Sequence, residues 1–209
     1  MRLKFLFILM FFWVSSPLMA APAIVILGDS LSAAYGMEIN QSWPSLLQQR
    51  LTENGYAYRV FNSSIAGDTT QGGAARLPRL LDRNQPDIVI LELGGNDGLR
   101  GLPIEVTGKN LSTMIEQSQS AGASVILSEM RIPPNYGRTY TEKFNTMYTT
   151  LAQQYGISLL PFLLDDIALE PGLMQADGIH PTARAQPLIL DKVWLQLEPL
   201  LNQPLKVKN

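Results

Sequence analysis

The sequence contains no cysteine and only one histidine among its 209 residues. Without thiols the chain can form no disulfide bond and cannot carry a lipid on an N-terminal cysteine, so the core alone must hold the fold. One imidazole and no thiolate cannot assemble the ligand sets typical of zinc, which leaves only an all-oxygen metal site. We therefore expect neither a bound metal nor a cofactor.

The sequence also lacks a basic cluster and an apolar run long enough to span a membrane. Its formal net charge is −2, and without a basic patch we set DNA and RNA aside as partners. The N-terminal apolar run, Phe5 to Val14, is about half of the roughly twenty residues that a membrane-spanning helix needs. Because Arg2 and Lys4 precede it and small residues follow it, we expect a secretory signal peptide over residues 1–20, cleaved after Ala20.

The remaining residues are enough for one domain, expected over 21–203, with 204–209 as a frayed tail. Short apolar runs without strict alternation predict strands buried on both faces at Ala23–Leu27, Tyr58–Asn62, Asp87–Leu93, Ser124–Met130 and Ile157–Phe162. Helical patterns lie between and after them, at Trp43–Glu53, Gly73–Arg83, Glu105–Ser120, Thr141–Tyr155 and Thr182–Leu201. This alternation predicts a three-layer α/β/α sandwich around a five-stranded parallel sheet in the order 2-1-3-4-5.

Polar and glycine-rich segments follow the first three predicted strands. Ser30 follows the first strand, Gly67 lies in the loop after the second, and Asn96 lies in the glycine-rich loop after the third. The carboxyl ends of parallel strands meet at one edge, where ligands bind. His180 comes after the fifth strand and a long loop, so it can fold back over the same edge.

These residue types suit acyl transfer by a serine hydrolase. An unactivated hydroxyl is a weak nucleophile, so Ser30 needs a base, and His180, the single histidine, can supply it while Asp177 holds its ring. The oxyanion that forms needs donors, and the candidates are the backbone N–H groups of Ser30 and Gly67 and the side-chain amide of Asn96.

Each of these residues also has a plainer interpretation. His180, close to a glycine and next to a proline, can be a turn residue. Asp177-Gly178 is a common turn dipeptide, and Gly67 can be a turn glycine. Asn96 can cap a helix. Glycine-rich loops raise phosphate binding as a rival, but neither the GK[ST] ending of a P-loop nor a G-x-G-x-x-G is present.

Four blocks of the sequence resemble the signature blocks of the GDSL or SGNH hydrolases, in the same order and with similar spacing. They are Gly28-Asp29-Ser30-Leu31-Ser32, Ile65-Ala66-Gly67-Asp68-Thr69, Gly94-Gly95-Asn96-Asp97 and Asp177-Gly178-Ile179-His180-Pro181. Within that superfamily the chain most resembles the bacterial periplasmic enzymes that act as acyl-CoA thioesterases, lysophospholipases and arylesterases. The likeness extends through nearly all of the chain after residue 20.

The resemblance implies a flavodoxin-like SGNH hydrolase fold, a periplasmic location, and hydrolysis of esters and thioesters. It assigns Ser30 as nucleophile, His180 as base and Asp177 as the third member of the triad, with Ser30, Gly67 and Asn96 as oxyanion donors. The sequence departs from the family at Ala66, where a serine is more usual. If that hydroxyl braces the loop, this brace is missing here.

The substrates we expect are small-molecule acyl esters and thioesters, bound by a protein that acts as a monomer. The expected acyl-binding residues are Leu99, Leu102, Pro103, Ile104, Tyr136, Leu173 and Met174. Arg100, Arg131 and Arg138 could meet a phosphate or could be solvated loop residues. A carbohydrate acetylesterase and a catalytically silent binding module remain as alternatives.

Overall fold

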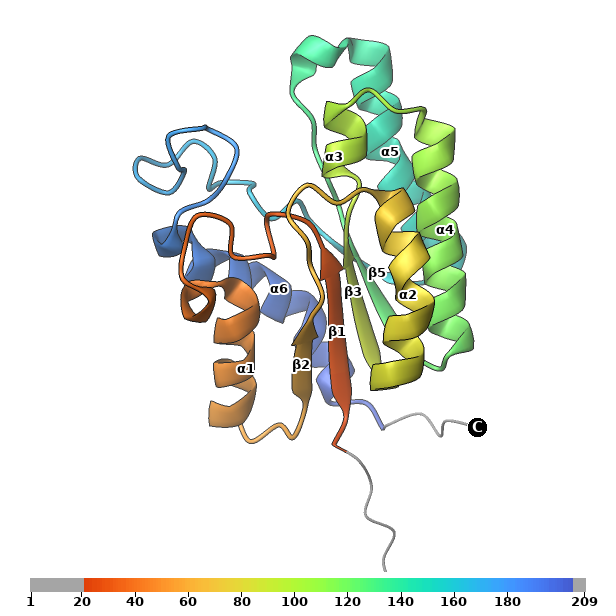
Figure 1. Ribbon diagram of the computed structural model, residues 1–209, viewed down its shortest axis with the longest axis vertical. Helices are drawn as coiled ribbons and strands as arrows, with labels where there is room; N and C mark the ends of the chain where they lie inside the picture. Colours follow the sequence, from red (N-terminus) through yellow and green to blue (C-terminus); the bar gives the residue numbers. More distant parts are fainter. Residues whose placement is uncertain (1–20, 205–209) are drawn as a thin grey trace, which may run out of the picture.

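A five-stranded parallel sheet in the order β2-β1-β3-β4-β5 forms the centre of the molecule, as predicted (Figure 1). The computed structural model describes residues 21–204, so the predicted signal peptide and all but the first residue of the predicted tail lie outside the described part. The strands are β1 (Ala23–Gly28), β2 (Arg59–Asn62), β3 (Ile88–Glu92), β4 (Ser124–Ser128) and β5 (Ser158–Leu160).

Helices cover both faces of this sheet and complete the predicted three layers (Figure 1). One face carries α1 (Trp43–Glu53) and α6 (Gln186–Leu201), which pack against each other. The other face carries α2 (Thr70–Asn84), α4 (Ile104–Ser120) and α5 (Arg138–Tyr155), with α4 in contact with both neighbours. No helix within residues 21–204 is long and apolar enough to cross a membrane.

The two central strands form the interior of the core. Every residue of β1 and β3 is buried, and the register pairs Ile24 with Ile88 and Leu27 with Leu91. Branched aliphatic side chains suit such doubly covered strands, and each contributes about 1.5–3 kcal/mol when fully buried. The sheet is thus rigid where its carboxyl ends must present side chains.

The structure corrects the prediction after the third strand. The segment Gly95–Leu99, expected as a glycine-rich loop, forms the short helix α3. Its backbone turns immediately after β3, and the Gly98 N–H donates to the Gly94 carbonyl at 2.9 Å. Helix formation fixes the direction of Asn96, which a loop would leave less defined.

Several element boundaries also differ from the prediction. Strands β4 and β5 end at Ser128 and Leu160, two residues earlier than expected, so Met130 and Phe162 belong to loops. Helix α2 begins at Thr70, and short 3₁₀ segments occur at Ile39–Gln41, Pro134–Tyr136 and Ala183–Ala185. The last of these replaces the expected first turn of the final helix.

Candidate functional site

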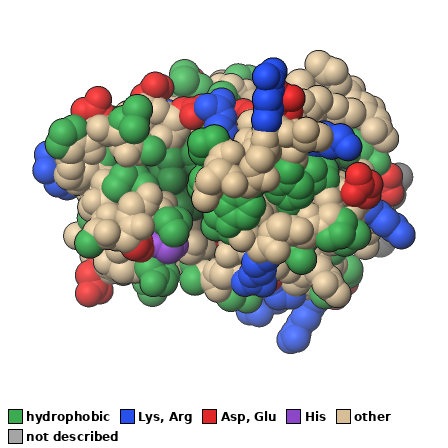
Figure 2. Space-filling model, turned by 90° about the horizontal axis from the view of Figure 1, so that it is seen from above, with side chains coloured by type: hydrophobic (Ala, Val, Ile, Leu, Met, Phe, Trp, Pro, Cys, Tyr) green, Lys and Arg blue, Asp and Glu red, His purple; other side chains and the backbone are tan. Residues whose placement is uncertain are grey.

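The predicted site residues come together at the carboxyl edge of the sheet. Ser30 follows β1, Gly67 lies between β2 and α2, Asn96 lies in α3, and His180 lies in the long segment before α6. Figure 2 shows this end of the molecule from above, with the single histidine at the surface and hydrophobic side chains around it. The crossovers of the fold therefore bring four distant segments to one place.

Ser30, His180 and Asp177 form a continuous chain of hydrogen-bonding atoms. His180 Nε2 lies 2.9 Å from Ser30 Oγ, and His180 Nδ1 lies 2.7 Å from Asp177 Oδ2. With the carboxylate accepting from Nδ1–H, Nε2 is left as the acceptor for the serine proton. In this arrangement the imidazole can remove a proton from the hydroxyl.

A tight local turn holds the carboxylate of Asp177. Its Oδ1 accepts from the backbone N–H groups of Ile179 and His180 at 2.9 and 3.0 Å. The His180 backbone N–H, the His180 side chain and the Ile179 N–H together lower the pKa of Asp177 from 3.8 to about 2. The carboxylate is therefore ionised at any pH at which His180 can act as a base.

Three hydrogen-bond donors, on two loops and on α3, lie around Ser30. Within residues 21–204, neither the Ser30 N–H nor the Gly67 N–H has a hydrogen-bond partner. Gly67 has a φ of +77°, a conformation that residues with a Cβ rarely adopt. The third donor is the Asn96 side-chain amide, which uses one of its two hydrogens elsewhere. These groups could bind an anionic oxygen.

A buried pair of carboxylates lies behind Asn96. Asn96 Nδ2 donates to Asp29 Oδ2 at 3.0 Å, which orients the amide. Glu92 Oε2 accepts from the Asp29 backbone N–H at 3.2 Å and from the Ser32 hydroxyl at 2.5 Å. Burial raises the pKa of Asp29 from 3.8 to about 6, and burial together with the Asp29 charge raises the pKa of Glu92 well above its usual value.

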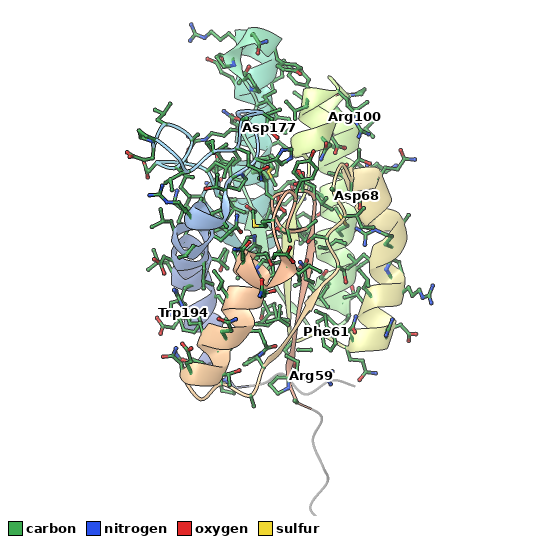
Figure 3. The ribbon with its side chains drawn as sticks, turned by 60° about the vertical axis from the view of Figure 1, so that its left-hand side comes forward. Arg59, Phe61, Asp68, Arg100, Asp177 and Trp194 are labelled. Atoms are coloured by element: carbon green, nitrogen blue, oxygen red, sulfur yellow. The ribbon has the colours of Figure 1, made fainter. Side chains whose placement is uncertain are left out.

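Position 66 is an alanine and has no hydroxyl to brace the loop that carries Gly67, but other contacts hold this loop. The Ile65 N–H donates to the Gly28 carbonyl at 3.0 Å, and Arg76 of α2 forms a 2.5 Å ion pair with Asp68. Arg100, at the end of α3, donates to the Gly67 carbonyl at 3.0 Å. In Figure 3, Arg100 and Asp68 lie towards the same end of the molecule as Asp177.

A cavity of about 230 Å³ opens beside Ser30 and His180. Within the described residues, Leu99 is the only one of the seven predicted acyl-binding residues that lines this cavity. Pro103 is the N-cap of α4, and Ile104, Leu173 and Met174 pack against the core. Leu102 and Tyr136 also lie outside the lining.

The other apolar residues of the cavity were missed from the sequence. They are Leu31, Met130, Phe162, Leu164 and Ile179. The sequence pattern predicts Met130 and Phe162 as the last residues of strands, whereas both follow strands that end at the same edge as Ser30. Their position just after these strands is the feature of the sequence that could have indicated a place in the cavity. Arg131 also lines the cavity, but it forms a 2.7 Å ion pair with Asp165.

The structure offers no cluster of three or more His, Asp or Glu residues that could hold a metal ion, as far as residues 21–204 are concerned. The two carboxylates nearest to the site, Asp29 and Asp177, are engaged with Asn96 and His180.

Comparison with known proteins places this arrangement in a recognised family. The model of the GDSL-like lipase/acylhydrolase family matches residues 26–187. The esterase TesA of Pseudomonas aeruginosa is 48% identical over 182 residues, which cover 87% of this chain and 90% of that protein. The Escherichia coli K12 thioesterase 1/protease 1/lysophospholipase L1 is 46% identical, with 88% and 86% of the two chains covered.

The fold has close counterparts among solved structures. The psychrotrophic esterase EstA from Pseudoalteromonas sp., solved inhibited by monoethylphosphonate, superposes with a TM-score of 0.83 at 40% identity. The match covers 87% of this chain and 99% of that one. The resemblance to GDSL or SGNH hydrolases drawn from the sequence is thus confirmed, as is the predicted strand order.

Proposed function

This chain belongs to the GDSL-like lipase/acylhydrolase family, and we propose that it is a serine hydrolase of carboxylic esters and thioesters. The observation that carries the proposal is the alignment of Ser30 Oγ, the two ring nitrogens of His180 and the Asp177 carboxylate, at 2.9 and 2.7 Å. A histidine that served only in a turn would not need a hydroxyl at one nitrogen and a carboxylate at the other.

The reaction proceeds in two acyl-transfer steps. Ser30 Oγ attacks the carbonyl carbon while His180 Nε2 takes the hydroxyl proton, and Asp177 stabilises the resulting imidazolium. The oxyanion accepts hydrogen bonds from the Ser30 and Gly67 N–H groups and from Asn96 Nδ2. His180 then gives its proton to the leaving alkoxide or thiolate. Water, activated by the same imidazole, releases the acid from Ser30.

The substrates are esters and thioesters with an acyl chain longer than acetyl. A cavity of about 230 Å³, bordered by Met130, Phe162 and Leu164, has room and apolar surface for several methylene groups. A site closed beyond acetyl would have favoured a carbohydrate acetylesterase, and this cavity favours the longer chains. The names of the relatives, esterase and thioesterase/lysophospholipase, support the same substrate classes.

Labelling with a fluorophosphonate tests the proposal. The probe phosphonylates an activated serine, so we expect stoichiometric labelling at Ser30 and loss of p-nitrophenyl ester hydrolysis. Ser30→Ala and His180→Ala should each lower kcat by about 10³-fold or more. The matched control is Ser45→Ala, since that hydroxyl only bonds the Ile39 carbonyl and Ser42. Intact Ser30 that resists the probe would point to a binding module without catalysis.

Export to the periplasm is part of the proposal. The residues that support it are Arg2, Lys4 and the apolar run from Phe5 to Val14. Sequencing the N-terminus of the protein from a periplasmic extract should give Ala21 as the first residue. We also propose that the enzyme acts as a monomer, because every group assigned to the reaction comes from one chain.

A further inference from the structure

The ring of Tyr35 lies against the imidazole of His180, on a side that the hydrogen bonds of the site do not use. The ring centroids are 4.0 Å apart and the planes are inclined by 30°. Tyr35 is 46% exposed, and its hydroxyl has no hydrogen-bond partner within the described residues. Its contact with the site is therefore made by the aromatic face and not by the phenol group.

The backbone around Tyr35 is strained in a way that keeps this contact. Ala34 has a φ of +59°, which a residue with a Cβ adopts only when its surroundings enforce it. Gly36 has a φ of +70°, and a Cβ there would lie 2.4 Å from Gln175 Oε1. The turn is thus shaped to fit against Gln175, and Tyr35 is the residue at its centre.

Gln175 joins this turn to the segment that carries His180. Its Nε2 donates to the carbonyls of Tyr35 and Pro181 at 2.9 and 3.0 Å. Its backbone N–H donates to the His180 carbonyl at 2.8 Å. One residue therefore bonds the backbone of Tyr35 and the backbone carbonyls of His180 and of the residue that follows it.

The charge on His180 changes during the proposed reaction, and this makes an aromatic neighbour important. The charged groups that face the imidazole are Asp177, at 2.7 Å, and the carboxylate of Asp29 beyond Ser30. The face of an aromatic ring carries partial negative charge and attracts a cation within about 6 Å. At 4.0 Å the Tyr35 ring is placed to favour imidazolium over neutral imidazole.

We propose that Tyr35 is a positioning residue for the reaction, which holds the imidazole of His180 in line with Ser30 and stabilises its protonated form. The inference rests on the proposed function, since it assigns Tyr35 a part in the same proton transfer. The aromatic ring is the group that acts, and the hydroxyl is dispensable.

Replacement of Tyr35 by Phe and by Leu separates the ring from the hydroxyl. Tyr35→Phe should keep kcat/KM for a p-nitrophenyl ester within about twofold, because the phenol makes no bond that is lost. Tyr35→Leu should lower kcat by about 3- to 30-fold, as expected for loss of a cation–π contact. In Tyr35→Leu the imidazolium loses a stabilising neighbour, so the acid limb of this variant's kcat/KM profile should move to lower pH by roughly half a unit.

Pentafluorophenylalanine at position 35 gives a second test that keeps the size and shape of the ring. Fluorination reverses the charge on the face, so kcat should fall and the acid limb should move as in Tyr35→Leu, with the thermal unfolding midpoint of Tyr35→Phe retained. Normal kcat in the fluorinated variant, or a lower kcat without movement of the acid limb, would overturn the inference. Failure of the wild type to label at Ser30 would refute the proposed function itself.

Discussion

The carboxylate of Asp97 accepts both the backbone N–H and the hydroxyl of Thr70, at 2.9 and 2.5 Å. Asp97 is the neighbour of Asn96 in α3, and Thr70 begins α2 three residues after Gly67. Both residues are almost fully buried, so this pair of bonds is shielded from water. Two of the proposed oxyanion donors, Asn96 in α3 and Gly67 in the loop before α2, are therefore connected through residues close to them in the sequence.

Removal of the Thr70 hydroxyl should weaken this connection. In Thr70→Val, the Asp97 carboxylate loses a buried charge-assisted bond, which costs about 1.5–3 kcal/mol of the free energy of unfolding. We also expect kcat to fall by about 3- to 10-fold, since a small displacement of a donor weakens oxyanion binding. Urea unfolding and steady-state kinetics measure the two effects.

Thr150→Val in α5 is the matched control for Thr70→Val. Its exposed hydroxyl bonds only the Thr146 carbonyl of the same helix, so stability should change by no more than about 0.5 kcal/mol. If the two valine variants were equal in both stability and kcat, the Thr70–Asp97 connection between α2 and α3 would have no energetic role.

Replacement of Asp177 by asparagine should test how the histidine is held. Asp177→Asn keeps the shape of the side chain but removes the negative charge next to Nδ1, so kcat should fall by about 10²- to 10⁴-fold. Because the pKa of Asp177 lies at about 2, protonation of Asp177 itself should not contribute to the acid limb of the wild-type kcat/KM profile. In Asp177→Asn that limb should move to lower pH, since the imidazolium has lost its counter-charge.

The variant Asp166→Asn provides the comparison for Asp177→Asn. Asp166 has a φ of +64°, a conformation that asparagine tolerates well. Its kcat should stay within twofold of the wild type. Asp177→Asn with more than a tenth of the wild-type kcat would mean that the carboxylate contributes little to catalysis.

Ser30 and His180 could be proposed as catalytic residues from the sequence, whereas the lining of the cavity beside them could not. Ser30 and His180 are recognisable because their chemistry needs particular residue types, and parallel strands deliver such residues to one edge. Apolar lining residues have no such signature. The apolar pattern predicts Met130 and Phe162 as the last residues of hydrophobic strands. In the structure β4 and β5 end two residues earlier, so both residues lie in loops.

The contacts of Asp29 and Tyr35 also could not be predicted from the sequence, for a different reason. Asp29 lies in the GDSL block, but its interaction with Asn96 depends on the exact turn of α3, which was expected as a loop. Tyr35 is placed by backbone torsions at Ala34 and Gly36 that have no clear residue pattern. Side-chain geometry across separate loops needs the tertiary structure.

The buried Asp29–Glu92 pair predicts that stability falls as the pH rises. The folded state raises the pKa of Asp29 from 3.8 to about 6, so between these values it binds more protons than the unfolded chain. This stabilisation is complete below about pH 4 and is lost as the pH rises through about 6. Because the pKa of Glu92 is also raised, its ionisation adds to the loss as the pH rises further. The loss should be roughly 1–3 kcal/mol.

Glu92→Gln removes one member of the pair while nearly keeping its size. The variant should show a flatter dependence of the free energy of unfolding on pH between about pH 5 and pH 8, measured by urea unfolding. The exposed Glu170 supplies the control, since Glu170→Gln should retain the wild-type slope. An unchanged slope in Glu92→Gln would show that the pair ionises without cost to the fold.

Phe162 offers a way to change the acyl-chain preference, because it is only partly buried and borders the cavity. Phe162→Trp adds volume to the apolar wall, so long chains lose contacts while acetyl esters still fit. Each excluded methylene is worth about 1 kcal/mol or more, so kcat/KM for p-nitrophenyl decanoate should fall at least about 10-fold relative to the acetate. Phe61→Trp, on β2 and at the other end of the molecule from Asp177 (Figure 3), should leave this ratio unchanged. An equal loss for both esters in Phe162→Trp would mean that the acyl chain binds elsewhere.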